Sequence, residues 1–258
     1  MKPKLSIITI NYNNFAGLRS TITSVLSQTS NEYEYVVIDG GSNDGSRDLI
    51  SENDSNLSYW ISEKDCGVYH AMNKGILASS GEYILFINSG DYLVNNSVLD
   101  DAMVYLADTD LIYGDILFRH PGAPPFLKTY PPNIDFEFFL SDSLPHPCTF
   151  IKRDVFNSVG LYDEDFSICS DYKFFLDAIC KFNCSSKHID IAITSFGLDG
   201  ISSVNESRGL LELEKKEILN SGYSEWMRMH EKIKRLELEL RSLNSSTLFR
   251  ALKRMRII

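Results

Sequence analysis

The sequence lacks the features that mark disulfide-rich, zinc-binding, membrane-spanning and nucleic-acid-binding proteins. Its 258 residues include five cysteines, an odd number, without a C-x-x-C pair. A disulfide framework and a zinc site are therefore both disfavoured, and reduced thiols in a cytosolic protein are expected. No apolar run approaches the roughly 20 residues needed to cross a bilayer, and the chain begins almost directly with a strand, which predicts no signal peptide. A net charge of −10 argues against a general nucleic-acid binder.

The charge is distributed unevenly along the chain. From Arg228 to the C-terminus there are nine lysine or arginine residues and three glutamates. The tail is therefore basic, and the body before it is strongly acidic. A basic tail on an acidic body indicates contact with something anionic.

Strand and helix patterns alternate at short, regular spacing over the first 115 residues. The expected strands are Leu5–Ile10, Tyr33–Ile38, Leu57–Ser62, Glu82–Ile87 and Leu111–Gly114, and the expected helices are Phe15–Gln28, Ser46–Glu52, Val68–Ala78 and Val98–Ala107. This order predicts an α/β fold with a Rossmann-like, mostly parallel sheet and helices on both faces.

The residues from Ile116 onward follow a more mixed pattern. Five prolines between positions 121 and 132 indicate a hairpin or loop over the sheet edge. Further expected elements are strands at Cys148–Lys152 and Ile189–Phe196, a helix at Ser170–Phe182 with Ser170 as its N-cap, and a mobile segment at 198–207. Residues 1–115 and 116–205 are therefore expected to form two halves of one domain, and residues 206–258 a helical tail.

The tail has the periodicity of helices with one apolar side. Six residues follow a 3-4 spacing, the pattern of a short coiled coil: Trp226, Met229, Ile233, Leu236, Leu240 and Leu243. A second stretch, Thr247–Arg256, sets apolar against basic residues and is typical of an interfacial helix. Contact with a membrane surface and packing against the body or a second copy, as in a homodimer, are both open.

Two predicted strands each end in a carboxylate beside glycines. Tyr35–Asp39 runs into Gly40–Ser46, and Ile84–Ile87 runs into Asn88-Ser89-Gly90-Asp91. Ligands of open α/β sheets bind beyond the carboxyl ends of parallel strands, so Asp39 and Asp91 are candidates for one shared site. Asp91 is placed where a metal ion or a phosphate-bearing ligand would be held. For either acid alone, capping of a turn is the simpler explanation.

Four segments of the chain share an order and spacing with one enzyme family. They are Ser6–Asn13, Val36–Ser46, Ser62–Gly75 and Gly81–Asp91. Together they resemble the inverting family 2 glycosyltransferases of the GT-A fold, in particular the bacterial subgroup that builds capsule, O-antigen and colanic-acid-type polysaccharides. The resemblance implies transfer of a sugar from a nucleotide-diphosphate donor, first a UDP-sugar, to a glycan or lipid-linked acceptor. It places the enzyme in the cytoplasm or at the inner face of the membrane.

The resemblance also implies which residues bind the donor. Asp39 would accept a hydrogen bond from the base, uracil in this reading. Lys74 would bring a positive charge to the diphosphate, although a solvated helix lysine is an equal alternative. The implied donor-binding set is Thr9, Asn11, Asn13, Asp39, Ser42, Asp44, Asp65, Lys74, Asn88, Ser89, Gly90 and His146.

A divalent cation, Mn²⁺ or Mg²⁺, is implied as cofactor. Departure of a diphosphate builds negative charge that such a cation neutralises. The family has a D-x-D-like motif where this chain has Asn88-Ser89-Gly90-Asp91, which leaves Asp91 as the metal ligand. Weak metal binding is therefore expected, with Asn88 able to hydrogen-bond the ribose or a phosphate.

Inversion needs one base to take the proton of the attacking hydroxyl. Asp171, at the start of the predicted helix after Gly160–Glu164, matches the base of the resembling enzymes. Stabilisation of the helix dipole is the competing explanation for an acid there. Asp163 and Glu164 are alternative bases, although their positions are typical of loop acids. His146 matches a histidine near the donor or acceptor, and a turn histidine held between prolines is its simpler explanation.

Three other functions compete with an inverting transferase. A sugar nucleotidyltransferase would share the α/β class, but the N-terminal region has no glycine- and basic-rich phosphate loop. A dehydrogenase is weaker still, because Gly40–Gly45 is not a G-x-G-x-x-G motif. A non-catalytic binding or scaffold protein is favoured by the metal motif, which has only one acid here. The presence of Asp39, Asp91 and Asp171 together argues against it.

Overall fold

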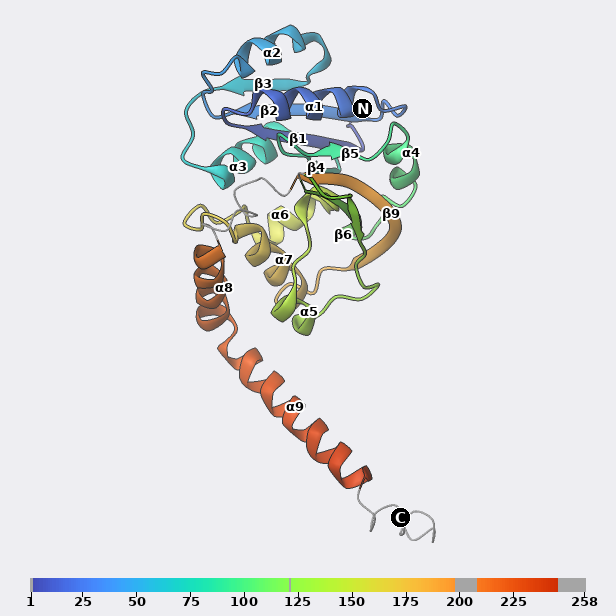
Figure 1. Ribbon diagram of the computed structural model, residues 1–258, viewed down its shortest axis with the longest axis vertical. Helices are drawn as coiled ribbons and strands as arrows, with labels where there is room; N and C mark the ends of the chain where they lie inside the picture. Colours follow the sequence, from blue (N-terminus) through green and yellow to red (C-terminus); the bar gives the residue numbers. More distant parts are fainter. Residues whose placement is uncertain (1, 121, 198–207, 246–258) are drawn as a thin grey trace. The chain divides into compact units, whose positions relative to one another are not determined.

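The computed structural model describes residues 2–120, 122–197 and 208–245. It divides the chain into two compact units, residues 1–214 and residues 215–258. The first unit is an α/β body, and the second is helical in the part that is described (Figure 1). Within the described ranges, no helix combines the length and the apolar character that crossing a membrane requires.

The body is built on one mixed sheet. Its strands are β1 (Leu5–Asn11), β2 (Tyr33–Asp39), β3 (Tyr59–Ser62), β4 (Tyr83–Phe86), β5 (Tyr92–Leu93), β6 (Leu111–Arg119), β7 (Phe126–Lys128), β8 (Thr149–Lys152) and β9 (Ser186–Gly197). Their order in the sheet is β3-β2-β1-β4-β8-β6-β9-β5, with β7 paired to β6 (Figure 1).

The first four strands form the parallel part of the sheet. In their register, Asn11 on β1 and Ser62 on β3 both lie opposite Asp39 on β2. All seven residues of β1 are buried, as expected for a strand covered on both faces. The predicted α/β fold with a Rossmann-like sheet is confirmed. In the other part of the sheet, β5, β7 and β8 run antiparallel to their neighbours, while β9 pairs parallel with β6 and curves around it (Figure 1).

All the predicted helices of the body are present. The helices of the body are α1 (Phe15–Leu26), α2 (Ser46–Glu52), α3 (Val68–Ala78), α4 (Val98–Met103), α5 (Phe136–Ser141), α6 (Arg153–Val159) and α7 (Ser170–Cys180). Helices α2 and α3 have the predicted bounds, and α1, α4 and α7 end two to four residues earlier than predicted. The short helices α5 and α6 were not predicted. Ser170 was predicted as the N-cap of α7, but Cys169 occupies that position and Ser170 is the first helical residue.

The connecting segments and the tail complete the description. The predicted hairpin is confirmed by the antiparallel pairing of β6 with β7. The tail forms α8 (Arg208–Gly222) and α9 (Ser224–Ser245), and the boundary between the two units falls within α8. The predicted mobile segment 198–207 and the predicted helix Thr247–Arg256 lie outside the described residues.

Two arginines from the second half of the body bind peptide groups of the first half. Arg119, on β6, donates from Nη2 to Gly90 O (2.7 Å) and stacks on the ring of Tyr92. Arg153, at the start of α6, donates from Nε to Gly81 O (2.7 Å) and from Nη2 to Ser79 Oγ (2.8 Å). These contacts join the halves that the sequence pattern separates at residue 115.

Candidate active site

Asp39 is the centre of a hydrogen-bonded cluster at the end of β2. The residue is fully buried. Its Oδ1 accepts from Asn11 Nδ2 (2.7 Å) and Ser42 Oγ (2.6 Å), and its Oδ2 accepts from Ser42 N (2.9 Å) and Ser62 Oγ (2.6 Å). Because Asn11 and Ser62 are the register neighbours of Asp39, the parallel sheet itself assembles this cluster.

These hydrogen bonds favour the ionised form of Asp39. Burial alone would raise its pKa, but the bonds from Ser42, Ser62 and Asn11 outweigh burial and hold the pKa of Asp39 below its ordinary value. The carboxylate is therefore charged at neutral pH, and its charge is already compensated by four protein donors.

We expect Asp39 to stabilise the fold at neutral pH and to stop doing so in acid. A carboxyl with a lowered folded-state pKa contributes fully above its unfolded pKa of about 3.9, and the contribution is lost as the pH falls through the lower folded pKa. Urea unfolding should show a loss of stability in Asp39→Asn at pH 7 that shrinks below about pH 4. Asp190→Asn, at an exposed position on β9, is the control. A deficit that does not change with pH would contradict the expectation.

The turn after β2 is fixed by two of the predicted donor residues. Asp44 accepts from the backbone N–H of Phe15 through Oδ2 (2.8 Å) and from that of Ser46 through Oδ1 (3.0 Å), so it binds the first residues of α1 and α2. Asn13 accepts from Asn43 N through its Oδ1 (2.9 Å), and its own N–H donates to Ser42 Oγ. Both residues thus build the rim of the Asp39 cluster.

Two further predicted donor residues are already engaged within the protein. Thr9 is fully buried, and its Oγ1 donates to Ile87 O (2.7 Å) and lies 2.9 Å from Tyr35 Oη. Lys74 Nζ lies 2.6 Å from Glu63 Oε1 in an ion pair. Thr9 therefore supports the strands beneath the site, and the charge of Lys74 is compensated by its neighbour.

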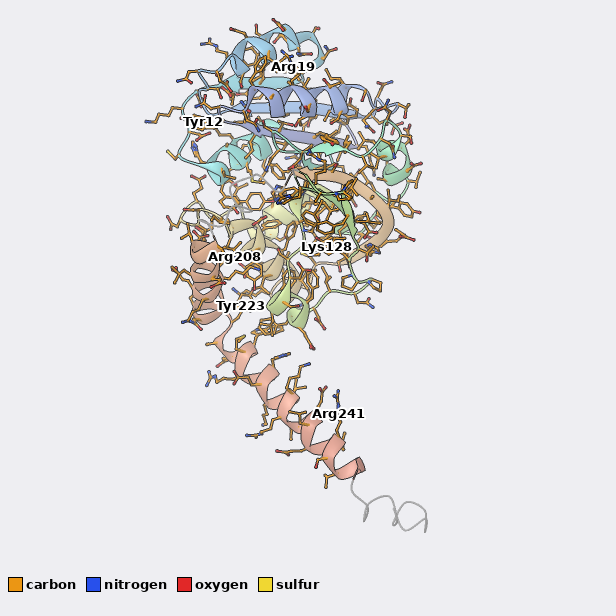
Figure 2. All side chains as sticks on the ribbon, in the orientation of Figure 1. Tyr12, Arg19, Lys128, Arg208, Tyr223 and Arg241 are labelled. Atoms are coloured by element: carbon orange, nitrogen blue, oxygen red, sulfur yellow. The ribbon has the colours of Figure 1, made fainter. Side chains whose placement is uncertain are left out.

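The strand-end surface beside Asp39 is formed by Asp65 and an exposed tyrosine. A Cβ placed on Gly40 would lie 2.6 Å from Asp65 Oδ2 and 3.2 Å from the ring of Tyr12. Glycine at position 40 thus allows these side chains to come close to the backbone. Tyr12, labelled in Figure 2, is 67% exposed, which makes it an available aromatic face at the predicted nucleoside position.

The loop after β4 is held in a defined shape. Gly90 has φ +104°, a conformation that favours glycine. Thr21 of α1 accepts from Gly90 N (3.1 Å) and donates to Asp91 O (2.6 Å), and Asn14 Nδ2 donates to Ser89 O (3.1 Å). Asp91 is 6% exposed, and its Oδ1 accepts from the N–H of Gly197. The loop therefore presents Asp91 on a rigid support.

A row of hydrogen bonds connects this loop to the candidate base. Asn88 Nδ2 lies 3.0 Å from His146 Nε2, and His146 Nδ1 lies 3.0 Å from Asp171 Oδ2. With Asn88 donating to Nε2, a neutral imidazole carries its proton on Nδ1 and donates it to Asp171. In the sequence these three residues belong to separate motifs, and the fold brings them together.

The other oxygen of Asp171 is held by Tyr69 of α3. Tyr69 Oη lies 3.0 Å from Asp171 Oδ1 and 2.5 Å from Ile168 O, so its one proton is shared between these two acceptors. Asp171 Oδ1 also accepts from the N–H of Tyr172 (2.8 Å). Burial, reinforced by the negative charge of Asp171, raises the pKa of Tyr69 well above its ordinary value. The phenol therefore stays protonated and remains a donor to Asp171 at physiological pH.

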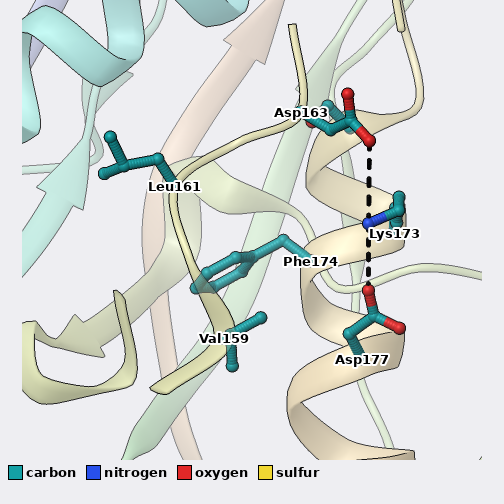
Figure 3. A pocket seen from close by; sticks show the side chains of 7 residues that line it. Val159, Leu161, Asp163, Lys173, Phe174 and Asp177 are labelled. Carbon is teal, nitrogen blue, oxygen red and sulfur yellow. Dashed lines mark hydrogen bonds and ion pairs between the residues drawn. The ribbon is translucent and has the colours of Figure 1, made fainter. Parts of the chain in front are cut away.

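The two alternative bases are engaged in other contacts. Glu164 Oε1 accepts from Asn73 Nδ2 (2.8 Å). Asp163 lies 3.7 Å from Lys173, which also pairs with Asp177 at 3.2 Å (Figure 3). Figure 3 shows these side chains lining a small depression beside α7 with Val159, Leu161 and Phe174. Of the three acids, Asp171 is the one joined to the loop after β4.

A buried glutamate holds the segment that precedes Asp171. Glu214 of α8 is 7% exposed. Its Oε1 accepts from the N–H of Ser167 (2.8 Å), and its Oε2 accepts from the N–H groups of Ile168 and Cys169 (2.9 Å each). Cys169 is the N-cap of α7, so this carboxylate binds the start of the helix that carries Asp171.

The loop after β4 offers oxygen ligands to one cation. In the described part of the chain, no group of three or more histidines, cysteines or acids could hold a metal ion. Asn88 Oδ1 is buried without a hydrogen-bond partner, and it belongs to the same loop as the carboxylate of Asp91. These residues fit a hard cation that takes few protein ligands and completes its shell with phosphate oxygens.

Four residues of this region were not singled out by the sequence analysis. They are Tyr12, Ser62, Tyr69 and Glu214. Ser62 could have been found, because a parallel register places it beside Asp39, and Tyr12 is an aromatic residue in a polar turn. Tyr69 and Glu214 left no local signal, because their partners are far away in the sequence.

Strand-end carboxylates around a rigid loop, with a third carboxylate at a helix start, are an arrangement typical of an α/β protein that binds a ligand at the edge of its sheet. The comparisons with known proteins agree. Residues 6–159 match the family described as Glycosyl transferase family 2, and the chain belongs to this family. It is accordingly a glycosyltransferase.

A curated relative supports the family, and solved structures share the fold. The chain is 31% identical over 208 residues to an uncharacterized glycosyltransferase of Mycobacterium tuberculosis, covering 79% of each chain. Its fold matches that of TarS 1–349 of S. aureus in complex with UDP-GlcNAc, with a TM-score of 0.65 and 21% identity over 85% of this chain and 67% of that one. The match to a longer TarS structure covers 85% of this chain and 40% of that one.

A second solved structure has the same fold. It is the mannosyltransferase PcManGT of Pyrobaculum calidifontis in complex with GDP-Man and Mn²⁺, with a TM-score of 0.59 and 17% identity. The match covers 76% of this chain and 57% of that one. The predicted GT-A fold and the predicted family are thus confirmed.

Proposed function

We propose that the chain transfers a sugar from a UDP-sugar donor to a glycan or lipid-linked acceptor, with inversion at the anomeric carbon. The observation that carries the proposal is the hydrogen-bonded row from Asn88 through His146 to Asp171. It sets a carboxylate beside the loop that carries Asp91, where the diphosphate of a donor is expected. This is the position in which a base can meet an acceptor hydroxyl.

Asp171 acts as the general base in this proposal. As the acceptor oxygen forms its bond to the anomeric carbon, its proton passes to the Asp171 carboxylate, and the bond from that carbon to the diphosphate breaks. A single displacement of this kind inverts the configuration. Tyr69 and His146 each bind one oxygen of Asp171, which keeps the carboxylate oriented for the proton transfer.

In this proposal the donor binds along the carboxyl ends of β1, β2 and β4. Tyr12 offers a face on which the nucleobase can stack, and Asp65 lies next to it at Gly40. The Asp39 cluster forms the floor below them, and this geometry favours a shaping role for Asp39. The nucleotide sugars bound by TarS and PcManGT support a donor of this class.

Asp91, with Asn88 beside it, would hold the divalent cation. Bound there, Mn²⁺ or Mg²⁺ would neutralise the charge that develops on the departing diphosphate. The Mn²⁺ in the PcManGT complex supports a cation of this kind. Because this chain supplies one carboxylate, we expect the donor phosphates to contribute much of the binding.

Titration calorimetry tests the donor site. The full chain is titrated with UDP, GDP and CDP, each with and without Mn²⁺. Binding of UDP that Mn²⁺ strengthens, and that weakens in Asp91→Asn, supports a UDP-sugar donor with Asp91 as the metal ligand. Preference for GDP would assign a different donor. Binding of none of the three would overturn the transferase proposal and favour the scaffold function.

The acceptor and the cellular location remain predictions from the sequence. A lipid-linked acceptor at the inner face of the membrane is consistent with the nine basic residues from Arg228 onward, because the surface there is anionic. Product analysis with lipid-linked and free glycans would distinguish the two acceptor classes.

A further inference from the structure

Helix α9 carries a narrow row of exposed apolar side chains. Met229, Ile233, Leu236, Leu240 and Leu243, here called the α9 seam, are between 49% and 64% exposed. Their spacings of four, three, four and three residues are those of positions d, a, d, a and d of a heptad repeat. A strict 3.5-residue period keeps such a row on one side of a supercoiled helix, and it is narrower than the face a globular core requires.

The residues flanking the α9 seam have complementary charges. With Ile233 and Leu240 at position a, Lys232 takes position g and Glu237 takes position e of the following heptad. In a parallel two-stranded coiled coil, these positions face each other across the two helices, so each Lys232 meets Glu237 of the second copy. Ile233 at a and Leu236 at d also favour two strands.

The charge of α9 distinguishes a second copy from a membrane as the partner. An interfacial helix on anionic lipid carries a predominantly basic polar face. Helix α9 instead has five lysine or arginine residues and four glutamates. Its charge is thus nearly balanced, as expected for a helix paired by interhelical salt bridges. The excess of basic residues in the tail lies mainly after α9, in residues 246–258.

We propose that α9 pairs with α9 of a second copy of this chain as a short parallel coiled coil. The α9 seam forms its core, and two Lys232–Glu237 pairs fix its register. A coiled coil of about two and a half heptads is short, so the dimer is expected to dissociate on dilution. The proposal concerns α9 alone and is independent of the function proposed for the body.

Sedimentation velocity of the full chain over a range of concentrations tests the proposal. We expect a monomer–dimer equilibrium. Leu236→Glu, which places a charge in the seam, should give a monomer at every concentration. The matched control is Leu238→Glu, which makes the same change two residues away at a more exposed position off the seam. The control should dimerise as the wild type does.

A charge exchange tests the register without touching the core. Lys232→Glu should weaken the dimer several-fold, and the double variant Lys232→Glu with Glu237→Lys should restore it. Circular dichroism of each variant confirms that the helices are retained. A wild type that is monomeric at all concentrations, a dimer that persists in Leu236→Glu, or equal losses in both leucine variants would overturn the proposal.

A membrane partner gives a different outcome. The wild type and both leucine variants are pelleted with vesicles of anionic phospholipid and with neutral vesicles. Binding to anionic vesicles by a chain that stays monomeric in solution would assign α9 to the membrane instead of a second copy.

Discussion

Asp171→Asn is expected to reduce the turnover of the enzyme by about 10²–10⁴-fold, the usual contribution of a general base. Asparagine keeps the shape of the side chain and can still accept from Tyr69, but it cannot take the proton of an acceptor hydroxyl. Nucleotide binding should be unchanged, because Asp171 bonds to the donor loop only through His146 and Asn88. Turnover and calorimetric binding of UDP measured on the same sample separate these two effects.

The matched control for this variant is Asp163→Asn. Asp163 belongs to the same region, and its contact with Lys173 is a partly exposed ion pair at 3.7 Å, so its removal should change turnover little. Should Asp171→Asn retain most of the wild-type turnover, Asp171 is not the base, and Glu164 is the next carboxylate to test. Loss of UDP binding together with turnover would indicate that the variant disturbs the fold.

Glu214→Gln is expected to destabilise the body by about 2–4 kcal/mol. The carboxylate of Glu214 accepts from three backbone N–H groups, and a glutamine has one acceptor oxygen and an NH₂ group that would face further donors. All three amides then lose a charged acceptor, and at least one of them is left without an acceptor, at about 1–3 kcal/mol for an unsatisfied group. Urea unfolding measures the difference, with the body's own fluorescence as the signal.

The control for Glu214→Gln is Glu212→Gln on the same helix. Glu212 is exposed, and the substitution changes the net charge by the same amount. Its expected effect is within about 0.5 kcal/mol, as for most surface positions. Equal midpoints for the two variants would show that the three N–H contacts add nothing to stability. Reduced turnover in Glu214→Gln, at temperatures where the variant remains folded, would show that Glu214 helps to position Asp171.

The fold and the location of the site could be predicted because their signals are local. An apolar run followed by a carboxylate and glycines identified Asp39 and Asp91. Because parallel strands end at one edge of the sheet, these two acids were expected at one shared site. The short helices α5 and α6 escaped prediction because six or seven residues hold too little of a helical period to stand out, and neither follows a glycine-rich turn like the one before the similarly short α2.

The connections between the parts of the site could not be predicted from the sequence. His146 lies 58 residues from Asn88 and 25 from Asp171, and no local pattern encodes a row of hydrogen bonds across such distances. The ion pair of Lys74 with Glu63 likewise depends on how α3 packs. This ion pair compensates the positive charge that Lys74 would bring to a diphosphate, and the residue type alone does not reveal it.

The arginines that join the two halves of the body limit how related enzymes can exchange parts. Arg119 completes the loop that carries Asp91, and Arg153 binds the turn before β4. A hybrid that combined residues 1–115 of this chain with the second half of a relative would keep those loops but lose their supports. To preserve the loop after β4, such a chimera would have to retain both arginines together with His146, which bonds to Asn88.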